Sequence, residues 1–259
     1  MTRVMRHPFR FGVRMIWFTA EIVFAAFDFL FAHCFRRGAP PALALARARC
    51  LQRHSRRILR VLGVEVSAGG RVPASGLLVS NHLSYLDVLV LGTITPAVFV
   101  AKSEVRGWPV FGWLARRAGT LFIERAKRSD VARVNDEADR LLAAGMLLVI
   151  FPEGTSSDGR EVLPFKSSLL EPIVGRRHPL SVAHISYEVE DGDAGEDVCY
   201  WGDMTFGPHL LKLLSKRHVR ASVIFTAVEQ QADSRKELAR QLHSEVSRLK
   251  AASAAQPAA

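Results

Sequence analysis

The fold of this chain is decided by residues 77–87, whose sequence is LLVSNHLSYLD. The first three residues form an apolar run, which is typical of a strand buried on both faces. His82 follows in the predicted turn, and Asp87 comes five positions later, where we predict the first turn of a helix. Five residues of regular helix rotate through about 140°, so the two side chains can meet only if His82 precedes the helix. The stretch therefore predicts a strand, a turn and a helix in succession.

The His82 and Asp87 side chains together suit acid–base chemistry. A neutral imidazole can take up a proton near pH 7, and a carboxylate can fix its tautomer and stabilise the imidazolium that forms. Such a pair can make a hydroxyl group nucleophilic without a covalent enzyme intermediate. Taken alone, the same spacing is more often a histidine at a helix start beside a capping residue.

Two segments further along the chain favour the catalytic interpretation. Residues 119–125 read GTLFIER and residues 151–155 read FPEGT. Together with the NHLSYLD segment, they resemble in order and spacing the glycerolipid acyltransferase family, in particular the 1-acyl-sn-glycerol-3-phosphate acyltransferases. The resemblance runs from about residue 64 to residue 228. It departs from the family pattern at Ser168, where the family often has glycine, and in a poorly matched fourth motif near residues 179–184.

The resemblance implies transfer of a fatty acyl group from acyl-CoA or acyl-carrier protein to the free hydroxyl of a lysolipid. The acceptor that it favours is 1-acyl-sn-glycerol-3-phosphate, which would give phosphatidic acid. His82 would be the general base and Asp87 its partner, and the reaction needs no metal or cofactor. A second lysolipid acceptor stays open, such as lyso-ornithine lipid, because residues 201–204 (WGDM) resemble bacterial members of both kinds.

Three basic residues are expected to bind the acceptor head group. The guanidinium of Arg125 offers a planar fork that matches phosphate, and Lys102 and Lys166 could supplement it. Without the family resemblance, a surface ion pair with Glu124 is the simpler interpretation of Arg125.

The FPEGT segment supplies the remaining expected substrate contacts. Glu153 could accept hydrogen bonds from acceptor hydroxyls, or could be the structural partner of a buried arginine. Backbone N–H groups near Gly154 and Thr155 are candidate donors to an anion or an oxyanion.

Composition points to an anionic partner. The chain has 259 residues, with 35 Lys and Arg against 25 Asp and Glu, and a formal net charge of +10. Nucleic acid and anionic lipid both fit this charge, and the apolar N-terminus decides for the lipid. Three cysteines show no paired spacing, which favours reduced thiols and the cytoplasmic face of the inner (plasma) membrane. A non-catalytic protein that binds membranes through its basic face is the alternative from another class.

The N-terminal residues predict two membrane-associated helices. Residues 11–35 are mostly apolar, but Arg14, Glu21 and Asp28 are spaced by seven and share one helical face. Because a spanning helix would bury these charges at high cost, we expect a helix in one leaflet or against a partner helix. An ordinary buried core helix is the alternative. Residues 42–62 form a second, basic amphipathic pattern, which indicates a membrane surface or a solvated face.

The rest of the chain predicts one α/β domain with a mixed, mostly parallel sheet flanked by helices. We assign residues 1–62 to the membrane-associating helices, 63–250 to the acyltransferase domain and 251–259 to a disordered tail. The acidic residues 190–197 are most simply a solvated turn. Buried strands are expected at 77–80, 97–101, 147–151 and 182–186, and helices at 129–144 and 234–250.

Overall fold

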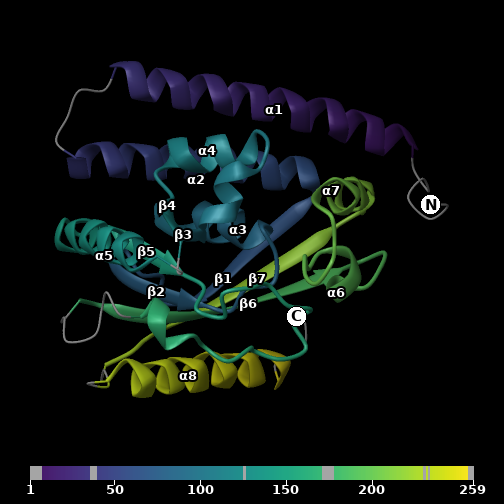
Figure 1. The fold of residues 1–259 in the computed structure, drawn as a ribbon. Coiled ribbons are helices and arrows are strands. Elements are labelled where there is room, and N and C mark those ends of the chain that lie inside the picture. Colours follow the sequence, from purple (N-terminus) through teal and green to yellow (C-terminus); the bar gives the residue numbers. More distant parts are fainter. Residues whose placement is uncertain are drawn as a thin grey trace.

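A seven-stranded sheet forms the centre of the protein, with helices on both faces (Figure 1). The computed structural model describes residues 8–35, 40–124, 127–170, 178–229, 232 and 234–255. The strand order is β1-β7-β6-β2-β5-β3-β4, and β6–β7 is the antiparallel pair among otherwise parallel neighbours. The predicted class, a mixed and mostly parallel sheet, is confirmed. The strands are β1 (Val64–Gly70), β2 (Gly76–Ser80), β3 (Val98–Lys102), β4 (Leu121–Ile123), β5 (Leu147–Ile150), β6 (Leu180–Val189) and β7 (Val219–Ala227).

The helices cover the sheet in two groups. Core residues of α2, α3 and α7 pack on one face, and those of α5 and α8 pack on the other. In Figure 1, α1 and α2 lie on one side of the sheet and α8 on the opposite side. The helices are α1 (Pro8–Phe35), α2 (Pro40–Leu62), α3 (Leu86–Ile94), α4 (Phe111–Ala118), α5 (Arg128–Ala143), α6 (Ala194–Asp197), α7 (Phe206–Ser215) and α8 (Arg235–Ala255), with short 3-10 helices η1 (Ser103–Gly107) and η2 (Ser167–Leu169).

Strand β2 lies in the middle of the sheet and is buried along its whole length. Its side chains alternate, so that Leu78 joins the core under α2 and α3, whereas Leu77 and Val79 join the core under α5 and α8. A strand covered on both faces needs apolar residues at every position, which explains the continuous apolar run. The parallel neighbours β5 and β6 place the carboxyl end of β2 at the edge where open α/β sheets bind ligands.

The predicted strands and helices are found within a few residues of their expected bounds. Strands β1, β4 and β7 were not expected: β1 lies at a sheet edge and is largely exposed, and β4 has three residues. The predicted tail is wrong for residues 251–255, which continue α8. Alanine is the best helix former, so this Ala-rich segment extends the helix by a further turn. Residues 256–259 lie outside the described residues.

Helix α1 turns its polar stripe inward. Arg14 donates to carbonyl groups of Leu214, Lys216 and Arg217 at the end of α7. On α2, His54 places its two ring nitrogens 2.6 Å from a Glu21 oxygen and 3.0 Å from an Asp28 oxygen. The polar groups of the stripe are therefore hydrogen-bonded by α2 and by the end of α7.

The outer face of α1 is apolar and exposed. A second apolar stripe, including Phe18 and Phe29, packs inward. Within the described part of the chain, none of the helices is both long enough and apolar enough to cross a bilayer. The exposed apolar side chains of α1 are Phe9, Val13, Ile16, Trp17, Val23, Phe24, Phe27, Leu30 and Phe31.

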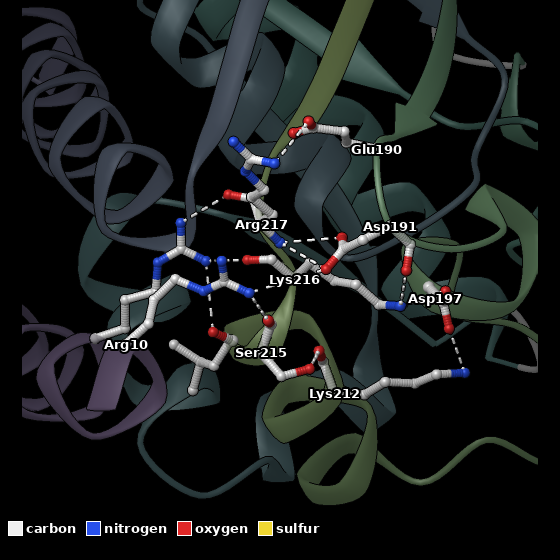
Figure 2. A network of polar contacts seen from close by, with 10 residues as sticks. Arg10, Glu190, Asp191, Asp197, Lys212, Ser215, Lys216 and Arg217 are labelled. Carbon is white, nitrogen blue, oxygen red and sulfur yellow. Dashed lines mark hydrogen bonds and ion pairs between the residues drawn. The ribbon is translucent and has the colours of Figure 1, made fainter. Parts of the chain in front are cut away.

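A polar network ties the start of α1 to the α7–β7 connection (Figure 2). Arg10 donates to the carbonyl of Ser215 at 2.8 Å and lies 3.9 Å from Asp191. Asp197 is buried and lies 2.6 Å from the Lys212 ammonium and 2.5 Å from that of Lys216. The solvated-turn interpretation of residues 190–197 is therefore wrong for Asp197.

We predict that Asp197→Asn lowers the free energy of unfolding at pH 7 by about 2 kcal/mol, the usual order for hydrogen bonds to a charged group. Burial opposes ionisation, but the hydrogen bonds from Lys212 and Lys216 outweigh it and hold the pKa of Asp197 below the ordinary value of 3.8. This stabilisation is present above the unfolded-state pKa and is lost as the pH falls through the folded-state pKa. Denaturant unfolding at pH 7 and below pH 4 measures the free energy of unfolding of variant and parent. The difference between the two free energies should be smaller in acid.

The matched control is Glu190→Gln, which removes an exposed carboxylate of the same network. We expect a change within about 0.5 kcal/mol there. Equal losses of unfolding free energy in the two variants would show that the buried Asp197 carboxylate stabilises the fold no more than the exposed Glu190.

Candidate active site

The turn after β2 is held to β6 by a single side chain. Asn81 is buried, and its amide nitrogen donates to the Ile185 carbonyl at 2.9 Å while its oxygen accepts from the Ile185 N–H at 2.7 Å. The side chain thus continues the β2–β6 pairing by one position. As a result, His82 leaves the sheet at a defined point.

His82 and Asp87 meet in the predicted way. His82 lies in the turn and Asp87 in the first turn of α3, with Nδ1 of His82 2.8 Å from Oδ2 of Asp87. The same oxygen accepts from the N–H groups of Leu83 at 2.6 Å and Ser84 at 3.0 Å. Asp87 is completely buried, so these hydrogen bonds replace its lost hydration.

Two aromatic residues complete the surroundings of the pair. The Tyr187 hydroxyl, from β6, donates to the other Asp87 oxygen at 2.6 Å. The His82 ring stacks on Phe151, with 4.3 Å between ring centroids and 17° between planes. These contacts orient the imidazole through its Nδ1 and its face, and Nε2 has no partner among the described residues.

The FPEGT segment holds the backbone of His82. Oε1 of Glu153 accepts from the His82 N–H at 3.0 Å, and the Ser157 N–H donates to the His82 carbonyl at 3.0 Å. Gly154 has a φ of +70°, and its N–H donates to the Phe151 carbonyl, so the segment turns tightly after β5.

Glu153 is a buried carboxyl group that is only partly satisfied. It is 2% exposed, and Oε2 has no hydrogen-bond partner among the described residues. Burial raises the pKa of Glu153 to about 7, against the lowering effect of the His82 N–H. The structure places Glu153 beneath His82 and not among the residues that line the adjacent cavity.

His82 lines a cavity of about 320 Å³ whose walls are mainly apolar and aromatic. From the set of predicted binding residues, Lys102, Gly154 and Thr155 also line it. A second cavity, of about 170 Å³ and almost wholly apolar, shares part of its wall with the first and reaches α1 and α2. The shared lining residues are Tyr85, Val88, Val105, Trp108, Ala115 and Thr120.

The remaining predicted residues are not brought to this cavity in the described structure. Lys166 is exposed, and its backbone N–H donates to the Pro152 carbonyl at 2.8 Å. Arg125 lies outside the described residues. Its neighbour Glu124 pairs with Lys127 at 2.8 Å. The role of Arg125 stays a prediction.

Sequence reasoning missed Tyr187 and the actual role of Asn81. Tyr187 lies 100 residues from Asp87 in the chain, and no motif marks it. Asn81 stands next to His82 in the sequence, but nothing there shows that its side chain pairs with the backbone of β6. Both contacts are long-range, so a local pattern carries no signal for them.

Comparison with known proteins finds similarity to acyltransferases by sequence. A family model described as Acyltransferase matches residues 63–179. The lyso-ornithine lipid O-acyltransferase of Rhodobacter capsulatus is 37% identical over 69% of this chain and 67% of its own length. The 1-acyl-sn-glycerol-3-phosphate acyltransferase of Neisseria meningitidis is 29% identical over 76% of this chain and 78% of its own.

A solved structure shares the fold. The 1-acyl-sn-glycerophosphate (LPA) acyltransferase PlsC of Thermotoga maritima superposes with a TM-score of 0.65. It is 20% identical, and the match covers 95% of this chain and 97% of that one.

We predict that Glu153→Gln makes the protein more stable at pH 8 than the parent, by up to about 3 kcal/mol. A carboxyl whose pKa rises from 4.5 to about 7 on folding favours the folded state at low pH, and this advantage is lost as the pH rises through 7. The amide oxygen of glutamine can still accept from the His82 N–H. Thermal unfolding at pH 5 and pH 8 tests this, since the parent should lose more stability than the variant between the two. If the stabilities of parent and variant change in parallel with pH, ionisation of Glu153 does not destabilise the folded protein.

Proposed function

We propose that the chain transfers a fatty acyl group from an activated thioester to the free hydroxyl of a lysolipid. The chain belongs to the acyltransferase family, and this membership gives the class of reaction. The observation that carries this proposal is the His82–Asp87 pair at the wall of a mainly apolar cavity. Nδ1 is engaged by Asp87, which leaves Nε2 as the nitrogen able to accept a proton from the acceptor hydroxyl.

In the proposed reaction, Nε2 of His82 removes the hydroxyl proton as the oxygen attacks the thioester carbonyl. The buried Asp87 carboxylate stabilises the imidazolium. When the tetrahedral intermediate collapses, the C–S bond breaks and the thiolate takes the proton from His82. The products are the ester and the free thiol, and His82 is neutral again.

The oxyanion of the intermediate needs a hydrogen-bond donor near His82. The Gly154 N–H is already used by the Phe151 carbonyl. Thr155 lines the cavity, and its backbone N–H has no hydrogen bond in the part of the chain that the structure describes. Of the two candidate donors, Gly154 and Thr155, we therefore assign the oxyanion donor to the Thr155 N–H.

The apolar cavity between α1, α2 and α3 suits an alkyl chain. It adjoins the His82 cavity, and its lining includes Phe18 and Phe29 of α1. Burial of each methylene group contributes about 0.8 kcal/mol. A chain bound there would hold its carbonyl end near His82.

The comparisons favour lyso-ornithine lipid as the acceptor over 1-acyl-sn-glycerol-3-phosphate. The relative named for the first acceptor is 37% identical, and the relative named for the second is 29% identical. Lys102 at the cavity wall suits either acceptor, because ornithine offers a carboxylate and the glycerol lipid offers a phosphate. The donor is acyl-CoA or acyl-carrier protein.

The exposed face of α1 supports association with a membrane surface. Large apolar side chains such as Phe9, Ile16 and Phe31 are 60% or more exposed. A contiguous apolar face of this kind fits a helix that lies in the interface of one leaflet. We place the protein at the cytoplasmic face of the inner membrane.

We predict that purified protein acylates lyso-ornithine lipid faster than 1-acyl-sn-glycerol-3-phosphate, and that His82→Ala abolishes both reactions. Loss of a general base costs about 10²–10⁴-fold in turnover. Labelled acyl-CoA and acyl-carrier protein, each offered with a panel of lysolipids, measure the products directly. Near-normal turnover by a folded His82→Ala protein would overturn the mechanism, and a preference for the glycerol lipid would reverse the acceptor assignment alone.

We predict that Tyr187→Phe lowers turnover about tenfold, as expected for loss of a hydrogen bond to a charged group. Without the hydroxyl, Oδ1 of the buried Asp87 carboxylate loses its donor, so the carboxylate orients the His82 ring less firmly. Turnover should fall, while the half-saturation values for donor and acceptor stay close to those of the parent. A merely structural role would lower the melting temperature and leave the turnover of the folded protein unchanged.

A further inference from the structure

A basic groove lies between the outer two helices, away from the His82 cavity. It encloses about 410 Å³ and is lined by Arg14, Trp17 and Glu21 of α1 and by Arg57, Arg60 and Val61 of α2. The α1–α2 pair is an outer layer of the molecule (Figure 1).

The groove holds more positive than negative charge. Its one carboxylate, Glu21, lies 2.6 Å from His54 and 3.7 Å from Arg57. The Arg60 side chain is exposed and has no hydrogen bond or ion pair within the described residues. Burial, with the neighbouring Arg10 as a smaller cause, lowers the pKa of Arg14.

The groove borders the exposed apolar face of α1. Trp17 lines the groove and is 64% exposed. The Arg57 guanidinium lies 4.8 Å from the ring centroid of Phe24, another exposed residue of that face. Tryptophan is enriched at the level of lipid head groups, and basic side chains near that level are attracted to anionic lipid. If the apolar face enters a leaflet, the arginines reach phosphate depth.

We propose that the groove binds the phosphate group of an anionic membrane phospholipid, with Arg57 and Arg60 as its ligands. A guanidinium fork matches the phosphate oxygens and can bind them through two parallel hydrogen bonds. The lipid bound there is a structural partner of the α1–α2 pair and is distinct from the acyl acceptor. The inference rests on the membrane association proposed above.

The test compares two exposed arginines of α2 that have no partner among the described residues. Arg60 lines the groove, whereas Arg49 does not. We expect Arg60→Gln to weaken binding to phosphatidylglycerol vesicles about fivefold, and Arg49→Gln to weaken it less than about twofold. Sedimentation at constant ionic strength measures both, with phosphatidylcholine vesicles as the neutral reference.

Each other outcome overturns the proposal in a recognisable way. Equal losses in the two variants would mean that the charge of α2 acts diffusely. Binding of inorganic phosphate that depends on Arg60, without a difference on vesicles, would assign the groove to free phosphate. Impaired turnover with acyl-carrier protein, with vesicle binding intact, would assign it to an acidic donor protein. If the parent binds no vesicles but transfers acyl groups in detergent, the membrane association fails while the reaction stands.

Discussion

The site depends on one buried carboxylate that has no lysine or arginine beside it in the described structure. Asp87 is wholly enclosed, and a buried charge without compensation costs several kcal/mol. It is compensated by four donors: the His82 ring, the N–H groups of Leu83 and Ser84, and the Tyr187 hydroxyl. These donors come from the turn and from strand β6, and Asp87 itself lies at the start of α3. One charge therefore couples the turn conformation, the helix start and the sheet to the orientation of the imidazole.

Local features of this arrangement were predictable, and long-range ones were not. The apolar run before His82 and the spacing to Asp87 predict a strand, a turn and a helix, because each depends on neighbours within a few residues. Tyr187 reaches Asp87 through the pairing of β6 with β2, which no local pattern encodes. For Glu153 the sequence left two roles open, at the acceptor hydroxyls or beside a buried arginine, and in the structure one carboxyl oxygen accepts from the His82 N–H. The FPEGT segment indicates that Glu153 has a specific role, but a sequence pattern does not show which group its carboxylate contacts.

In the N-terminal helix, too, the local feature was predictable from the sequence and the long-range contacts were not. A period of seven places Arg14, Glu21 and Asp28 on one face, and the structure confirms that they share it. Periodicity cannot tell which way that face points. The partners lie on α2 and at the end of α7, so the charges turn inward. Two apolar stripes then remain, one packed on the domain and one exposed.

The strand order has a consequence for how the protein is made. Strand β1 pairs with β7, so Val64 lies opposite Val219, 155 positions later in the chain. Contacts of such long separation form late, because a large loop must close first. During synthesis, α1 and α2 leave the ribosome long before β7 exists to complete the sheet, and the polar partners of Arg14 at the end of α7 are also missing. We expect the nascent α1–α2 pair to depend on lipid or a chaperone for cover until the last quarter of the chain has been translated.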